Sequence, residues 1–108
     1  MARSKIGGAY NINQSIVNEA EKHGLDAMAT GGGLDYIYKH IGKNEDGSER
    51  VVILGDAEDA GSPDYLNSKC ELHILLCEDW TDQVTIPASN VRAGMAMMVA
   101  MYDPHAKP

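Results

Sequence analysis

The chain has 108 residues, of which 44% are hydrophobic and 23% charged, and its formal net charge is −7. This length suits one domain with a single core, and the composition is that of a globular protein rather than a disordered one. The negative charge argues against direct nucleic-acid binding, which relies on clustered Lys and Arg, and favours a basic protein surface as the partner.

No apolar run is long enough for a secretory signal or a membrane-spanning helix. No composition change or repeat divides the chain, so we expect one cytoplasmic domain over residues 1–108, without membrane contact.

The first predicted element is an amphipathic helix over residues 11–23. Its apolar residues recur at helical spacing and are Ile12, Ile16, Val17 and Ala20. Asn11 or Asn13 is placed to cap its start, and Gly24 follows where a helix commonly stops. Glu19 is expected on the exposed face of this helix.

Five strands are predicted in the middle of the chain, over residues 25–30, 34–41, 50–54, 71–78 and 83–86. Glycine-rich or acidic turns separate them, including Gly31–Gly33 and the Asp-Gly pair that ends at Gly47. Pro87 is expected to close the sheet region. Strands that follow one another through turns predict an antiparallel sheet with helices on one face, which is the α+β class.

The last predicted element is a helix over residues 91–102, capped by Ser89 or Asn90. It is apolar on nearly all sides, so more than one side has to be buried. One interpretation is a central core helix in a monomer. Another is a homodimer or partner interface, for which flexible methionines are well suited, and a cofactor pocket is a third. The interface residues predicted on this helix are Met97, Met98 and Met101.

Two acidic segments are candidate partner-binding sites. The first is the loop that contains Asp56, Glu58, Asp59 and Asp64. The second is a turn in which Glu78, Asp79 and Asp82 surround Trp80, an aromatic anchor that could instead fold back over the sheet edge. The spacing of the loop carboxylates matches no EF-hand, so we expect an electrostatic patch or a solvated loop there rather than a metal site.

Cys70, His73 and Cys77 bring thiol and imidazole groups close together in the sequence. On one strand Cys70 points to the opposite face from the other two, and no CxxC pair accompanies them, so we expect free thiols and no zinc site. The chain also lacks a nucleophile elbow, an HExxH motif and a P-loop. We therefore predict a protein that is not an enzyme and has no metal or cofactor.

The stretch from Leu25 to Tyr36, with Thr-Gly-Gly-Gly at its centre, resembles a hairpin found in small proteins of phages and plasmids. The resemblance implies an accessory or counter-defence protein, similar to anti-CRISPR inhibitors that block a basic nucleic-acid groove. It carries over no site residues. The leading hypothesis is such an inhibitor, with a homo-oligomeric interaction module as the alternative and a small ligand-binding domain or enzyme as the third.

Overall fold

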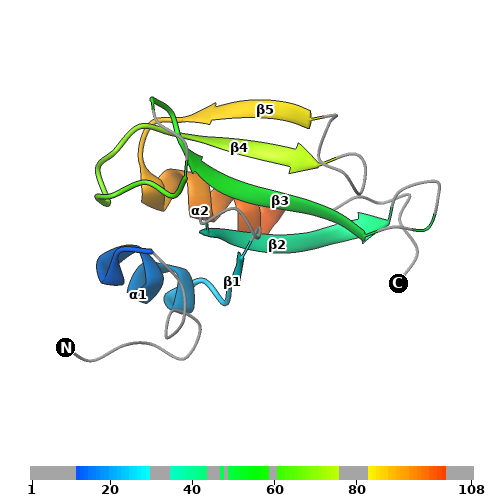
Figure 1. Ribbon diagram of the computed structural model, residues 1–108, viewed down its shortest axis with the longest axis horizontal. Coiled ribbons are helices and arrows are strands. Elements are labelled where there is room, and N and C mark those ends of the chain that lie inside the picture. The colour runs from blue at the N-terminus through cyan, green and yellow to red at the C-terminus, as the bar shows by residue number, and fades with distance from the viewer. Residues whose placement is uncertain are drawn as a thin grey trace.

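The computed structural model of the protein describes residues 12–29, 35–43, 47, 49–58, 61–75 and 83–101. In these ranges the chain forms two helices and one sheet (Figure 1). The elements are α1 (Gln14–Lys22), β1 (Asp26–Ala29), β2 (Asp35–Lys43), β3 (Glu49–Asp56), β4 (Cys70–Leu75), β5 (Gln83–Ala88) and α2 (Val91–Ala100). This order confirms the predicted α+β class.

The sheet has five strands in the order β1-β2-β3-β4-β5, and every neighbouring pair is antiparallel. Between β2 and β3 the register shifts at His40 and Gly42. The prediction that Pro87 closes the sheet is wrong, because Pro87 lies inside β5 opposite Glu71. Its place is physically reasonable, since β5 is an edge strand and a proline there needs no partner for an N–H group.

Helix α1 begins at the cap predicted for it and ends close to the expected glycine. The side-chain Oδ1 of Asn13 accepts a hydrogen bond of 3.0 Å from the backbone N–H of Ser15. At the other end Gly24 has a φ of 72°, which a glycine adopts without strain. Ile16 and Val17 are fully buried, so this helix lays its apolar side on the core.

The prediction that Glu19 lies on the exposed face of α1 is wrong. Glu19 is only 7% exposed, and its Oε1 lies 3.4 Å from Nε of Arg92 on α2. Lys22 is a second cation near the same carboxylate, at 3.8 Å. Glu19 therefore links the two helices, a contact that the periodicity of one helix cannot reveal.

Helix α2 is capped at both ends by polar side chains. Oδ1 of Asn90 accepts a hydrogen bond of 2.8 Å from the N–H of Ala93. At the C-terminal end Nζ of Lys39, on β2, donates to the carbonyls of Val99 and Met101 at 2.8 and 3.0 Å. A cation at this end also suits the helix dipole. The helix thus runs from the end of β5 to β2.

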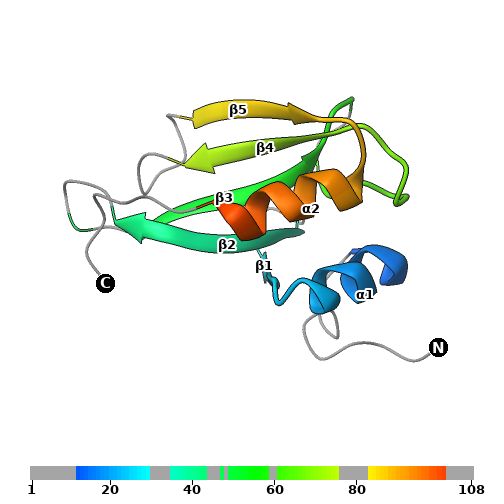
Figure 2. The ribbon, with the colours of Figure 1, turned by 180° about the vertical axis from the view of Figure 1, so that it is seen from behind.

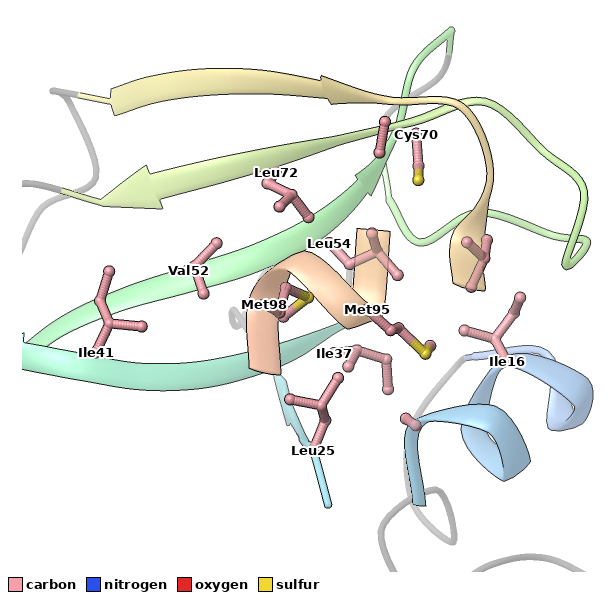
Figure 3. Packing of buried hydrophobic residues seen from close by; sticks show 13 residues of the cluster. Ile16, Leu25, Ile37, Ile41, Val52, Leu54, Cys70, Leu72, Met95 and Met98 are labelled. Atoms are coloured by element: carbon pink, nitrogen blue, oxygen red, sulfur yellow. The ribbon is translucent and has the colours of Figure 1, made fainter. Parts of the chain in front are cut away.

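Figure 2 shows α2 lying across one face of the sheet and α1 beside the β1 edge, and residues of both helices belong to the same core cluster. Figure 3 shows the core between α2 and the sheet, where Leu54 and Leu72 of the sheet meet Met95 and Met98 of α2. All four are fully buried. Gly94 permits this close approach, since an added Cβ would lie 3.0 Å from Leu54 Cδ1 and 3.1 Å from Sγ of Cys70.

The opposite face of the sheet carries a smaller apolar cluster. Val51, Ile53 and Leu75 are its buried members. The partly buried residues packed against them are Met28, Tyr36 and Tyr38. No helix of the described part of the chain packs on this face.

Candidate protein-binding surfaces

The loop of residues 57–69, which we call the β3–β4 loop, is held by hydrogen bonds at both of its ends. The N–H of Asp56 donates to the carbonyl of Gly61 at 2.9 Å, and the N–H of Ala57 donates to the carbonyl of Lys69 at 3.1 Å. The second bond extends the pairing of β3 and β4 by one residue. The acidic segment predicted here is therefore anchored to the sheet.

Two further bonds tie the middle of the β3–β4 loop to other elements. The N–H of Gly61 donates to the hydroxyl oxygen of Tyr36 on β2 at 3.2 Å. The carbonyl of Leu66 accepts a bond of 3.0 Å from the N–H of Val91, the first residue of α2. Since each bond fixes a different point, the described part of the loop keeps a defined orientation relative to the sheet and α2.

The structure describes three of the predicted acidic residues, of which Asp56 and Glu58 lie in contact and Asp64 lies further along the same loop. Oδ2 of Asp56 accepts a hydrogen bond of 2.9 Å from the N–H of Glu58, while Glu58 and Asp64 expose their side chains. Within the described residues neither Glu58 nor Asp64 has an ion-pair partner. Asp59 lies outside the described residues. The loop thus presents negative charge to the surroundings, with Lys69 at its last position.

Tyr65 is the residue of this loop that sequence reasoning missed. Its side chain is 67% exposed, although its backbone is fixed by Ser68. The N–H of Tyr65 donates to Oγ of Ser68 at 3.3 Å, and the N–H of Ser68 donates to the carbonyl of Tyr65 at 3.1 Å. The available signal was an aromatic residue in a polar loop directly after Asp64, outside any alternating pattern.

The second predicted acidic segment falls outside the described residues. It comprises Glu78, Asp79, Trp80 and Asp82. Its predicted role as an anchor for a basic partner therefore stays a prediction.

Cys70 and His73 lie on opposite faces of β4, so the structure does not bring them together. Cys70 is buried beneath α2, and its S–H donates to the carbonyl of Asn90 at 3.3 Å. Burial, helped by the negative charge of Asp56, raises the pKa of the Cys70 thiol to about 11. A thiol with such a pKa is a weak nucleophile at neutral pH. Cys77 lies outside the described residues.

The face of the sheet away from the helices carries the polar partners of two histidines. Nδ1 of His73 lies 3.1 Å from Oγ1 of Thr85, and its ring packs over Gly55, where an added Cβ would be 3.1 Å from Nε2. Nδ1 of His40 lies 3.1 Å from a carboxylate oxygen of Glu49. Hydrogen bonds from His40 and then from Lys43 lower the pKa of Glu49. Glu49 thus contacts both His40 and Lys43 on the exposed surface of the strands.

Within the described ranges, no three His, Cys, Asp or Glu side chains form a group that could hold a metal ion. In the same ranges no helix is long and apolar enough to cross a membrane.

The structure separates the three predicted interface methionines of α2. Met98 is fully buried in the chain's own core. Met97 and Met101 are partly buried and pack at the margin of the same core. The all-round apolar character of α2 thus reflects in part its position over the sheet.

Comparison of the chain with protein-family models, with curated proteins and with solved structures found no match.

Proposed function

We propose that this protein is a non-enzymatic binding protein that contacts a basic protein surface through its β3–β4 loop. The single observation that carries the proposal is the exposed Tyr65 next to Asp64, on a loop whose backbone is already fixed. A large aromatic side chain on an ordered loop loses little conformational freedom on binding, which is typical of an interface anchor.

The charges of the described residues favour a cationic partner at this end of the molecule. Glu58 and Asp64 extend the negative charge of Asp56 along the loop, whereas Lys43 and Arg50 lie at the other end of the β2–β3 pair. Exposed carboxylates attract a cationic partner at long range, so the loop carboxylates should act mainly on the association rate. The apolar contact of Tyr65 should act mainly on the dissociation rate.

The resemblance to phage and plasmid proteins leads to the finer proposal that the partner handles nucleic acid. Carboxylates on an ordered loop can occupy a groove that is lined with Arg and Lys for phosphate contacts. In this view the protein is an inhibitor, similar to those of the anti-CRISPR type, that competes with nucleic acid for the groove.

The binding proposal is tested with a synthetic Arg- and Lys-rich peptide and two variants of equal net charge. Glu58→Lys with Asp64→Lys alters the loop, and Glu21→Lys with Asp26→Lys alters exposed residues elsewhere. At low salt the loop variant should associate about ten times more slowly than the control variant. Equal rates for the two variants would show that net charge alone, not the loop, determines binding.

The role of the anchor and the identity of the partner need separate measurements. Tyr65→Ala should dissociate from the peptide faster than the wild type while its association rate is unchanged. The inhibitor proposal predicts that the protein displaces labelled DNA from a CRISPR effector complex in a salt-sensitive manner. Failure to displace DNA from a panel of such complexes would refute the inhibitor proposal and leave peptide binding as an independent result.

A further inference from the structure

Strand β5 lies at an edge of the sheet, and some of its backbone N–H and C=O groups point outward from that edge. It ends the strand order, so in the described part of the chain it pairs with β4 alone. The bond from Ala57 N–H to the Lys69 carbonyl shows which residues of β4 face β3. In an antiparallel strand the backbone N–H and C=O groups of successive residues point to opposite neighbouring strands. Every second residue of β4 therefore bonds to β3, and the residues between them bond to β5. The residues of β5 whose backbone groups point to the free edge are therefore Gln83, Thr85 and Pro87.

This edge lacks most of the features that prevent strand edges from pairing with another chain. Natural edge strands are usually short or carry charged side chains, Lys above all. The other edge follows that rule, because β1 has four residues and begins with the exposed Asp26. In contrast β5 has six residues and no charged one, with Pro87 near its end. On the helix side its Val84 side chain is 45% exposed.

We propose that β5 pairs antiparallel with β5 of a second copy of this chain, about a twofold axis through Thr85. In this register the N–H and carbonyl of Thr85 bond to those of the second copy's Thr85. The N–H of Gln83 donates to the carbonyl of the second copy's Pro87. Because Pro87 has no N–H, the carbonyl of Gln83 stays unpaired in each copy. The two sheets then join into one continuous sheet, with the helices of both copies on the same face.

The same register covers the exposed apolar side chain. Val84 lies opposite the second copy's Ile86 on the helix side, in a pair whose side chains approach closely. Ile74, which pairs with Val84 inside one chain, and Ile86 are already packed at the margin of the core. Pairing the edges therefore extends that core across the twofold axis.

The charge distribution favours a second copy as the occupant of this edge. With a net charge of −7, two copies repel each other over most of their surfaces, but β5 contributes no charge to that repulsion. The strand is also self-complementary about Thr85, because apolar residues meet apolar residues.

Sedimentation of the wild type and two matched valine variants tests the proposal. Val84→Lys adds a charge at the edge, and Val99→Lys adds the same charge at a side chain of similar exposure on α2, at 45% and 47% respectively. The wild type and Val99→Lys should dimerise in the micromolar range, and Val84→Lys should weaken dimerisation by about tenfold or more. A wild type that stays monomeric, or equal effects of the two substitutions, would overturn the proposal.

Cross-linking gives a readout that does not depend on how Val84→Lys folds. In chains that carry Cys77→Ser, Thr85→Cys should form a disulfide-linked dimer, because equivalent Cα atoms lie about 5.5 Å apart in such a pair. The exposed Ser89→Cys should not, since the register separates the two copies of residue 89. Absence of the Thr85→Cys dimer, or equal cross-linking of Ser89→Cys, would overturn the register. The Glu58 and Asp64 variant should dimerise normally, which separates this proposal from the loop.

Discussion

The two faces of the sheet bury apolar side chains by different means. On one face α1 and α2 cover a large cluster in which Leu54 and Leu72 are fully buried. On the other face Ile53 and Leu75 are 4% and 1% exposed, although no helix of the described residues lies over them. Aromatic and long side chains of the neighbouring strands pack against this small cluster. The stability of the fold should therefore depend much more on the helix side.

The largest effect is expected from a charge placed beneath α2. Met98→Asp should lower the free energy of unfolding by about 4 kcal/mol, because it puts an unpaired carboxylate into an apolar site. Val99→Asp, next to it on the exposed side of the helix, should cost less than about 1 kcal/mol. Urea denaturation of both variants measures the difference. Similar costs for the two would mean that α2 is not the cover of the core.

Neighbouring residues of β3 allow a direct comparison of the two faces. Leu54→Ala should cost about 4 kcal/mol and Ile53→Ala about 2 kcal/mol, since the cavity on the open side can collapse or admit water more easily. The two free energies of unfolding are measured under the same conditions. An Ile53→Ala variant that loses as much as Leu54→Ala would show that the open face is as tightly packed as the covered one.

A smaller loss is expected where α2 approaches the sheet most closely. Gly94→Ala improves helix propensity by about 1 kcal/mol, but its methyl group would press on Leu54 and Cys70 at a cost of roughly 2 kcal/mol. The expected net loss is therefore about 1 kcal/mol in the free energy of unfolding. Adding Cys70→Ala should make room for the methyl group, so the loss caused by Gly94→Ala should be smaller in that background.

The last effect appears only at high pH and concerns the protonation of Cys70. Its pKa is raised from 9.0 to about 11 in the folded protein, so the neutral thiol stabilises the fold below pH 9 and that contribution is lost as the pH rises toward 11. The wild type should therefore lose more stability across this range than Cys70→Ala does. Parallel urea titrations of the two proteins show whether the slopes differ. Identical slopes would mean that the thiol is not shielded by α2.

Local patterns were sufficient to predict the elements and their order. Alternation and turn chemistry indicate the strands, and the sequence narrows each helix cap to two candidates, of which Asn13 and Asn90 are the caps in the structure. Pro87 was misjudged because its effect depends on whether the strand lies at an edge, which only the assembled sheet decides. Glu19 was misjudged for a similar reason, since Arg92 reaches it from another helix.

The candidate site was predicted only in part, because burial and backbone fixation depend on distant contacts. The carboxylates of Asp56, Glu58 and Asp64 were recognised from the composition of their loop. Tyr65 was not, since its exposure follows from how the loop is fixed to β2 and α2. For Met98 the composition of the helix indicated burial, but only packing shows that the chain's own sheet supplies it.

The order of the sheet also bears on how the protein is made. Each strand pairs with the next one along the chain. Every strand can therefore pair with the strand before it as the chain leaves the ribosome. Its apolar cover, α2, is synthesised only after β5. A nascent chain that has emerged only as far as Ala88 therefore lacks the helix that covers Leu54 and Leu72. Such an intermediate should be held by ribosome-associated chaperones until α2 emerges and closes the core.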